Sequence, residues 1–578
     1  MVFHEITRKA IVHALEHGRD LDMALVNAQE ARRILDRLFG YSLSPVLWRK
    51  LSQQKLSAGR VQSPGLRMVV QRERQRMRFV SGSYWDIKAD LHQQQDQSGQ
   101  TFEAKLDSVQ GQRVATGKDF DAQTGKLLAN RRVLLLDEQQ AKELAERLAD
   151  ASWKVLSVDE KEKKQRPAPP FITSTLQQEG SRKLRLSAKD TMRIAQKLYE
   201  SGLITYMRTD SPMLSQEGIK GARDAAGTLF GLEYLSPTSR QYTTKSSSAQ
   251  EAHEAIRPAG EVFVHPDKSN LHGLDYALYE IIWKRTLASQ MAEAVKATTT
   301  GKIAADDAQF TATGNRILFP GFIRVYVEGK DDPEAALEDS ERFLPQLQEQ
   351  DVLKATVIEP IGHETKPPAR FTEATLVQEL EKLGIGRPST YATIIDKLFE
   401  KQYVVKEGTA LIPTFIGFAV VQLLENHFST LVDYDFTSKM EDALDGIAEG
   451  EVNQLDFLKS FYEGEQGLKQ QVASKIEQVL PNEAKRIELP HISDDFTILI
   501  GRYGPYISVR NGDEEQSTSA SIPQHVHPGS LTEEEIKKLL ELKVNGDDGP
   551  KPICHDPQSG LPVFLLSGKF GPYYQLGM

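Results

Sequence analysis

The sequence predicts a multidomain α+β protein in which helical domains alternate with β-rich ones. Three observations support this prediction. At 578 residues the chain is long enough for several domains. Stretches of alternating polar and apolar residues, typical of strands, flank a long helical insert. A helical pattern also recurs after 200 positions, and a glycine-proline motif recurs near the C-terminus.

The first predicted domain segment, residues 1–80, is helical. Apolar residues fall at helical spacing in 27–39, and a second helix follows the loop 57–64 and runs to about residue 79. Although the formal net charge is −10, basic residues dominate residues 32–78, and a second basic cluster covers 182–197. Either cluster alone is compatible with a solvated helix face. Together they favour a surface that follows a phosphate backbone.

Residues 81–165 and 294–363 are predicted to form one β-rich domain, which the chain leaves and re-enters. Strand-like alternation occurs at 84–89, and the apolar run 132–136 also predicts a strand. The charged, proline-containing stretch 161–170 predicts a linker. The insert, residues 166–293, is predicted to be helical and winged-helix-like, with a serine-rich surface loop at 236–248.

The insert is repeated in residues 364–482. Several apolar and polar positions recur 200 residues later, among them Phe171 and Leu176, which return as Phe371 and Leu376. At the position of Tyr206 the second copy has a lysine, Lys406. The shared fold therefore does not require a tyrosine there, which makes Tyr206 a candidate functional residue.

Residues 483–578 contain the second repeat, in which the motif at 501–506 returns at 568–573. Each copy places a basic residue beside aromatic residues on a glycine-proline frame. This motif either stacks on the bases of single-stranded nucleic acid or forms a β-turn whose aromatics fill a small core, and both alternatives stay open. Cys554 is the only cysteine, which excludes an internal disulfide and a four-cysteine zinc ribbon.

The segment 202–211 holds the strongest candidate for chemistry. Tyr206 ends an apolar run, and Arg208 follows two residues later. A phenolate can attack phosphorus, while a guanidinium can stabilise charge on phosphate oxygens. A Tyr-x-Arg triplet alone is weak evidence, because most such tyrosines are packing residues. All ten residues together, however, closely resemble the active-site segment of type IA DNA topoisomerases.

Further motifs at 26–37, 57–63, 250–258, 383–391 and 436–445 also resemble segments of this family, in the family's order. The resemblance implies a toroidal core of helical gate domains and a β-rich arch, followed by small β-rich C-terminal repeats. It also implies ATP-independent breakage, passage and rejoining of single-stranded DNA through a 5′-phosphotyrosine link, which relaxes negative supercoils.

The resemblance assigns roles to individual residues. Tyr206 would be the nucleophile, Arg208 would bind the scissile phosphate, and His253 would assist phosphate positioning or proton transfer. The remaining matched residues would contact DNA, with Asp36 orienting a neighbouring arginine: Arg32, Arg33, Asp36, Arg37, Tyr41, Trp48, Ser57, Ala58, Gly59, Arg60, Val61, Gln62, Arg257, Arg387, Ser389 and Thr390.

Magnesium is the cofactor that the resemblance implies, bound by the acidic cluster of a toprim domain. In the family this domain precedes the motif that here begins at residues 3–7, and no later segment replaces it. Asp433 and Asp435 form a D-x-D motif that we interpret as structural. We therefore expect no metal ligands and no zinc in this chain, and little or no activity unless another chain supplies the toprim residues.

The expected partner is single-stranded or underwound DNA, bound by a monomer. No signal peptide or membrane span is visible, so a cytoplasmic location is expected. Two other functions are weighed against this one. The first is a non-catalytic, single-stranded-DNA-binding fragment. The second, a winged-helix transcription regulator, is disfavoured because it explains neither the β-rich domain around the insert nor the unrepeated tyrosine.

Overall fold

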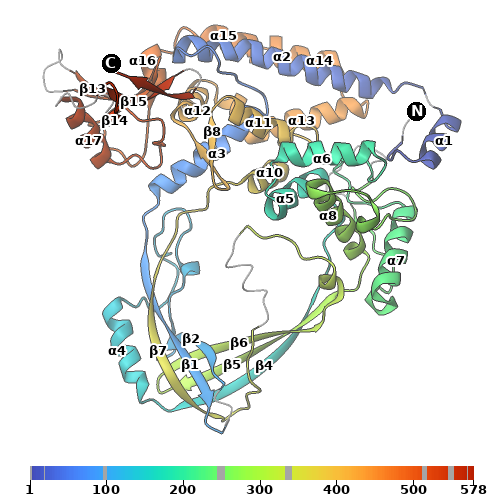
Figure 1. Ribbon diagram of the computed structural model, residues 1–578, viewed down its shortest axis with the longest axis vertical. Coiled ribbons are helices and arrows are strands. Elements are labelled where there is room, and N and C mark those ends of the chain that lie inside the picture. Colours follow the sequence, from blue (N-terminus) through green and yellow to red (C-terminus); the bar gives the residue numbers. More distant parts are fainter. Residues whose placement is uncertain are drawn as a thin grey trace.

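The computed structural model describes residues 3–18, 20–95, 100–243, 254–331, 342–510, 517–544, 552–568 and 571–577. Figure 1 shows a ring-like path of the chain, in which a helical region and a long curved sheet are joined at two ends. No described helix is long and apolar enough to cross a membrane. The toroidal, mixed α and β architecture that the sequence predicts is therefore the one observed.

Three helices open the chain: α1 (Arg8–Glu16), α2 (Met23–Leu51) and α3 (Gln62–Arg78). The Asp22 side chain caps α2 by accepting from the N–H groups of Ala24 and Leu25. The predicted helices at 27–39 and up to residue 79 are confirmed. However, α2 continues for a further 12 residues beyond Phe39, because its buried face runs on to Leu51.

The chain then enters a sheet of β1 (Ser83–Gln93), β2 (Phe102–Val109), β3 (Gln112–Arg113), β4 (Trp153–Gln165), β5 (Ala294–Ala305), β6 (Ala308–Phe319) and β7 (Val352–Glu364). The strand order is β1-β7-β4-β5-β6-β2-β3, and β1 also pairs with β2. The sheet thus closes on itself, and α4 (Glu138–Ala149) packs against β7 and β1. Strands from both sides of the insert belong to this one sheet.

Two sequence predictions in this region were wrong. Residues 132–136 form only isolated bridges, at Leu134 and Leu136, instead of a strand. Residues 161–165 are part of β4 and pair with β5, for example Lys163 opposite Lys296. Most of the second half of β4 is exposed, so charged residues can occupy both faces, and its pairing strand lies more than a hundred residues away in the sequence.

The repeated helical modules have equivalent internal contacts. The first contains α5 (Thr173–Leu184), α6 (Ala188–Glu200), α7 (Gln216–Phe230) and α8 (Gly273–Ser289). The second contains α10 (Glu373–Lys382), α11 (Tyr391–Glu400), the hairpin β8 (Val404–Glu407)–β9 (Ala410–Pro413) and α12 (Phe415–His427). Ile256 donates to the Phe171 carbonyl at 2.8 Å, and Leu411 donates to the Phe371 carbonyl at 2.7 Å. The repeat in the sequence is therefore a repeat in the fold.

Four helices complete the core: α13 (Tyr434–Ala448), α14 (Gln454–Glu463), α15 (Leu468–Lys475) and α16 (Pro481–Lys485). Asp433 caps α13 by accepting from Phe436 N–H, consistent with the structural interpretation of the D-x-D motif.

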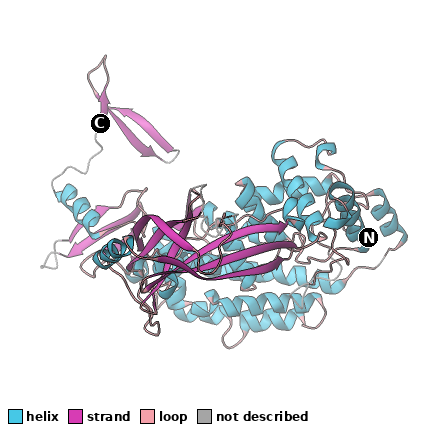
Figure 2. Cartoon of the chain, turned by 90° about the horizontal axis from the view of Figure 1, so that it is seen from below, coloured by secondary structure: helices cyan, strands magenta, loops and turns pink. Residues whose placement is uncertain are grey.

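The C-terminal part begins with β10 (Arg486–Ile487), β11 (Thr497–Gly501), β12 (Gly504–Arg510), β13 (Ser517–Ser521) and α17 (Glu533–Val544). A second small sheet follows, made of β14 (Pro552–His555), β15 (Pro562–Gly568) and β16 (Gly571–Leu576). Both repeated motifs close hairpins, with Gly501 opposite Gly504 and Gly568 opposite Gly571. Figure 2 shows the second sheet standing apart from the rest of the molecule.

Candidate active site

Tyr206 lies on a short segment outside helices and strands, which is hydrogen-bonded to its neighbours on several sides. Its backbone N–H donates to the His4 carbonyl at 2.7 Å, and Ile204 forms a β-bridge with Pro258. The hydroxyl of Thr205 donates to the Ala255 carbonyl at 2.7 Å. The backbone at Tyr206 is thus fixed by two segments that are remote in the sequence.

The side chains of this segment alternate between the core and the outside. Thr205, Met207 and Thr209 are buried, whereas Tyr206 is half-buried and Arg208 is exposed. Among residues 204–209, Tyr206 and Arg208 are thus the two whose side chains reach the surface. Thr173 locks this arrangement, because its hydroxyl donates to the Met207 carbonyl at 2.8 Å and accepts from Thr209 N–H at 2.9 Å.

The ring of Tyr206 packs edge-to-face on Tyr199, with 5.2 Å between the ring centroids. Burial, and then the negative potential of Tyr206, raise the pKa of the Tyr199 phenol. Tyr199 therefore stays protonated at neutral pH, and its ring packs against that of Tyr206.

Beneath this segment, Arg257 is engaged by two carboxylates. It donates to Glu254 from Nε at 2.5 Å and from Nη2 at 2.8 Å, and its Nη1 lies 3.3 Å from Glu5 Oε2. Arg257 is only 2% exposed. In this conformation it joins the N-terminal segment to residues 254–257 and cannot contact DNA directly, contrary to its expected role. His253 and residues 244–248 of the loop predicted at 236–248 lie outside the described residues.

The first module faces the second one across their repeated helices. Ala188 N–H donates to Glu373 Oε2 at 2.8 Å, and Lys189 pairs with Asp396 at 3.0 Å. Burial, with the negative charges of Glu381 and Asp210, raises the pKa of Tyr391. The negative charge of Asp210, four residues after Tyr206, therefore influences the pKa of Tyr391 on α11. The candidate nucleophile is on the side of the first module that meets the second.

A buried acid, Glu441 on α13, organises the arginines opposite. It accepts from Arg32 at 2.9 Å and pairs with Arg60, which also donates to Asp36 at 3.0 Å. Burial opposes ionisation of Glu441, but Arg60, Arg32 and Arg387 outweigh it and lower its pKa. Asp36 orients an arginine as expected. Arg60, at 2% exposure, is held inside the protein, so its expected contact with the DNA backbone is not available in this conformation.

Arg387 is held in the same way, by Asp445. Its Nε and Nη2 donate to Asp445 Oδ2 at 2.9 and 2.7 Å, and its Nη2 also reaches the exposed Asp442 at 3.1 Å. Of the neighbouring residues expected to bind DNA, Ser389 is exposed and Thr390 is half-buried. Arg387 therefore positions the loop that presents Ser389.

Apart from Ser389, the exposed members of the expected DNA-binding set lie on α2. Arg33, Arg37, Tyr41 and Trp48 are exposed, and their spacing of four, four and seven residues puts them along one stripe of the helix. The Arg37 guanidinium lies 5.1 Å from the centre of the Tyr41 ring. We call these four residues the α2 stripe. Arginines beside exposed aromatic rings suit both the phosphates and the bases of a single strand.

The loop at 57–62 is fixed by hydrogen bonds to its surroundings. Ser57 N–H donates to the Tyr403 hydroxyl at 2.7 Å, which donates back to the Ser57 carbonyl at 2.9 Å. Ala58 N–H donates to Ser44 Oγ at 3.2 Å. Gly59, Val61 and Gln62 are half-buried. The loop is a rigid connection between α2 and α3 whose role in DNA binding stays a prediction.

The basic run on α3 is engaged inside the protein. Arg67 and Arg74 both pair with Glu425, at 2.9 and 2.5 Å. Arg72 and Arg76 donate to the carbonyls of Ala369 and Pro368, at 2.6 and 2.7 Å. These arginines fasten the chain where it leaves β7 for α10. The sequence predicted that these arginines form either a phosphate-following surface or a solvated helix face. Both predictions are wrong for this part of the cluster.

The second basic cluster, at 182–197, is also largely paired. Arg182, Lys183, Lys189, Arg193 and Lys197 each contact a carboxylate, those of Asp331, Glu179, Asp396, Asp190 and Asp275 respectively. Several of these pairs are exposed and exchange readily with other anions.

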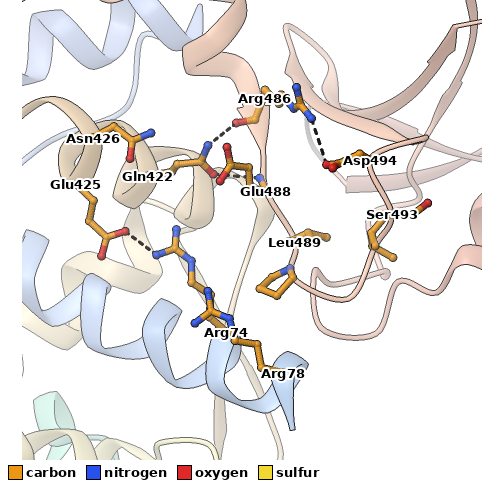
Figure 3. Close-up of a pocket in the computed structure, with 12 residues that line it drawn as sticks. Arg74, Arg78, Gln422, Glu425, Asn426, Arg486, Glu488, Leu489, Ser493 and Asp494 are labelled. Atoms are coloured by element: carbon orange, nitrogen blue, oxygen red, sulfur yellow. Dashed lines mark hydrogen bonds and ion pairs between the residues drawn. The ribbon is translucent and has the colours of Figure 1, made fainter. Parts of the chain in front are cut away.

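A pocket of about 540 Å³ lies away from Tyr206, where the core meets the first C-terminal repeat. Figure 3 shows Gln422 bridging to the backbone of this repeat. Its Nε2 donates to the Arg486 carbonyl at 3.1 Å, and its Oε1 accepts from Glu488 N–H at 3.1 Å. The pocket marks a joint between the core and the first C-terminal repeat.

No group of three or more His, Cys, Asp or Glu side chains that could hold a metal occurs among the described residues. Four acids of the family-like motifs do not fit a magnesium ion, because arginines already engage them: Glu5 and Glu254 by Arg257, Glu441 by Arg60, and Asp445 by Arg387.

Comparison with known proteins agrees with this geometry. Residues 20–459 match the family model described as DNA topoisomerase, and residues 494–551 match that of the topoisomerase C-terminal repeat. The chain belongs to the bacterial type IA DNA topoisomerase I family.

Several members of this family resemble the chain along its whole length. It is 52% identical to DNA topoisomerase 1 of Synechocystis and 47% identical to that of Mycobacterium tuberculosis. These alignments cover 100% and 99% of this chain but only 63% and 64% of the relatives. Full-length topoisomerase I from Thermotoga maritima superposes with a TM-score of 0.70 at 33% identity, covering 91% of this chain and 81% of that one.

The structure adds residues that the sequence did not single out. Glu441, Glu5 and Glu254 hold the arginines of the site, and Thr173 and Thr205 fix the Tyr206 backbone. Glu5, Glu254 and Glu441 lie in the family-like motifs at 3–7, 250–258 and 436–445, and Thr205 lies in the segment 202–211. The sequence does not show which group each of them contacts, because most of these partners are distant along the chain.

Proposed function

We propose that this chain carries the strand-cleaving and strand-rejoining residues of a type IA DNA topoisomerase, which relaxes negatively supercoiled DNA without ATP. The observation that carries the proposal is that Tyr206 and Arg208 both reach the surface, on a backbone locked by Thr173 and Thr205. The buried threonines hold both side chains in position before DNA binds, which is the preorganisation that transition-state stabilisation requires.

In the proposed reaction, the Tyr206 phenolate oxygen attacks the scissile phosphorus. An O–P bond to the tyrosine forms, and the bond between phosphorus and the 3′ oxygen breaks. The phenol gives up one proton and the leaving oxygen gains one, so the step is balanced without a cofactor that is consumed. Arg208 stabilises the charge that develops on the phosphate oxygens. The reverse attack by the 3′-hydroxyl reseals the strand, because the phosphotyrosyl ester conserves the phosphodiester energy.

Magnesium is part of the proposal, since the family uses it to align the strand ends. Because Glu5, Glu254, Glu441 and Asp445 are engaged by arginines, we propose that its ligands come from a toprim-containing segment or partner. The protein would act as a monomer on single-stranded or underwound DNA. Robust relaxation of a negatively supercoiled plasmid by this chain with magnesium would contradict the need for outside ligands.

The direct test uses a single-stranded oligonucleotide labelled at its 3′ end, since the 5′ side of the break stays on the tyrosine. The chain should form a labelled adduct that survives denaturing electrophoresis, and Tyr206→Phe should form none. Tyr199→Phe is the matched control, because it alters the neighbouring ring and keeps the proposed nucleophile. Salt-dependent binding without any adduct would instead favour the second candidate, a non-catalytic single-strand-binding protein, which the α2 stripe alone could support.

A further inference from the structure

We propose that Glu373 is a latch that holds the two helical modules together, and that Lys406 keeps this latch in place. Lys406 occupies the position at which the first module has Tyr206. The inference rests on the proposed function, because a strand can pass through the ring only if the ring opens. It assigns the closing contact to one buried carboxylate, which lies outside the set of residues that would cleave DNA.

The two modules meet as counterparts. Helix α5 packs against α10, and α6 packs against α11, so each helix contacts its own equivalent in the repeat. This is the arrangement of two subunits in a twofold symmetric dimer. Figure 1 shows α5 and α10 side by side at the opening of the ring. The equivalent residues Leu176 and Leu376 belong to two separate buried clusters, so each module keeps its own core if the two part.

The interface itself is imperfectly satisfied. Ser174 Oγ and both polar side-chain atoms of Gln177 have no hydrogen-bond partner in the part of the chain that the structure describes, and these residues are 2% and 1% exposed. Helical periodicity places both on the side of α5 away from Leu176, which packs in the core of its own module. Their equivalents on α10, Ala374 and Val377, are buried too. Because buried groups without partners cost free energy that water would return, a specific contact is needed to keep this interface closed.

Glu373, the first residue of α10, supplies that contact. Its Oε2 accepts from Ala188 N–H of the first module at 2.8 Å, and its Oε1 accepts from Lys406 Nζ at 2.9 Å. Ala188 is the first residue of α6, where backbone N–H groups have no partner within the helix and a negative charge is favourable. Glu373 is 4% exposed, so little water competes for these bonds. By contrast, the pair of Lys189 with Asp396, which also joins the modules, has side chains that are 67% and 38% exposed and contributes little.

The reciprocal contact cannot form. Thr173 stands where the second module has Glu373, and its hydroxyl is used to hold the segment of the candidate nucleophile. Pro388 stands where the first module has Ala188, and a proline has no N–H to donate. In the second module Lys406 compensates the buried charge of Glu373, which a latch of this kind requires. The lysine in place of the nucleophile therefore has a role of its own, in holding the modules closed.

The experiment measures how often the modules part, through the reactivity of a thiol placed between them. The full chain carries Cys554→Ser, which removes its only cysteine, and Ser174→Cys, which puts a thiol on the buried face of α5. This thiol reacts with a disulfide reagent such as DTNB only when the interface opens, so its labelling rate follows the opening equilibrium. Glu373→Ala should raise the rate about tenfold, as expected for the loss of one hydrogen bond to a charged group. Lys406→Met should also raise it, whereas Lys406→Arg, which keeps the charge, should leave it near the wild-type rate.

Two controls separate opening of the interface from loss of stability. Ala195→Cys, at a position that is 0% exposed in the core of the first module, reports unfolding of that module. Its labelling rate should be the same with and without Glu373→Ala. Glu379→Ala removes another carboxylate from α10, one whose side chain is 32% exposed, and should not change the labelling of Ser174→Cys.

The inference is overturned if Glu373→Ala leaves the labelling at residue 174 unchanged. It is also overturned if labelling at residues 174 and 195 accelerates equally, which would make Glu373 a purely structural residue. No effect of Lys406→Met would refute the part assigned to the lysine.

The labelling needs neither DNA nor cleavage, so failure of the proposed function would appear separately, as the absence of a Tyr206 adduct in the wild-type chain. Glu373→Ala should still form that adduct, because Thr173 and Thr205 fix the Tyr206 backbone within the first module. Loss of the adduct in this variant would place Glu373 in the cleavage site and contradict its assignment as a latch.

Discussion

The strongest energetic prediction concerns Glu441→Gln, which removes the buried negative charge opposite the Tyr206 module. The Glu441 side chain has no exposed surface, and that of Arg60 is 1% exposed. After the substitution Arg60 would keep only Asp36, whose side chain is 52% exposed. Since a buried charge that loses its partner costs about 3 to 5 kcal/mol, the free energy of unfolding should fall by about that amount.

The assay is urea unfolding at neutral pH, followed by circular dichroism. Asp442→Asn is the matched control on the same helix, because Asp442 pairs with Arg387 at 3.1 Å while its side chain is 64% exposed. It should cost no more than about 1 kcal/mol. Should Glu441→Gln prove no more costly than Asp442→Asn, the assignment of Glu441 as the organising charge would be wrong.

The pH dependence gives a second readout of the same residue. The pKa of Glu441 is lowered in the folded protein relative to its ordinary value of 4.5. A carboxylate with a depressed pKa stabilises the fold above the unfolded pKa, and this contribution is lost as the pH falls through the folded pKa. The wild-type protein should therefore lose stability below about pH 4.5, and Glu441→Gln should lose less over this range.

Two further substitutions test other parts of the structure. Ser174 Oγ and both polar side-chain atoms of Gln177 are buried without a hydrogen-bond partner. The double variant Ser174→Ala, Gln177→Val should therefore raise the free energy of unfolding, measured in urea, by about 1 to 3 kcal/mol. A lower free energy of unfolding in the double variant would contradict this. Gly202 has φ +71°, and a Cβ there would lie 2.7 Å from the Ile6 carbonyl, so Gly202→Ala should lower the melting temperature. Gly260→Ala, at φ +79° with open space around it, should lower it less.

The features that the sequence predicted well are local or repeated. Helical spacing of apolar residues located α2 and α3, and the 200-residue repeat identified two modules with the same backbone contacts. The Tyr206 segment was recognisable because its chemistry is contained in ten consecutive residues. Strand pairing was harder to predict from the sequence. Residues 161–165 were predicted to be a linker but belong to β4, because their partner strand β5 comes only after the whole insert.

The charge network could not be predicted because it depends on tertiary contacts. Arg60 and Glu441 are 381 positions apart, and Arg67 meets Glu425 358 positions later. From the sequence, each of these arginines resembles a free cation, and the basic run on α3 resembles a DNA-binding surface. Only the fold shows that these arginines are structural, whereas Arg33 and Arg37, in the same run of sequence, stay exposed.

The most direct test of the account is to trap Tyr206 on DNA with a substrate that needs no general acid. Oligonucleotides in which sulfur replaces the bridging 3′ oxygen, at each position in turn, release a thiolate, whose conjugate acid has a pKa of about 8.5. After nuclease trimming and trypsin digestion, mass spectrometry should find the nucleotide on the peptide spanning residues 198–208, with fragmentation placing it on Tyr206. Modification of Tyr199 instead, or no modified peptide at all, would contradict the assignment of the nucleophile.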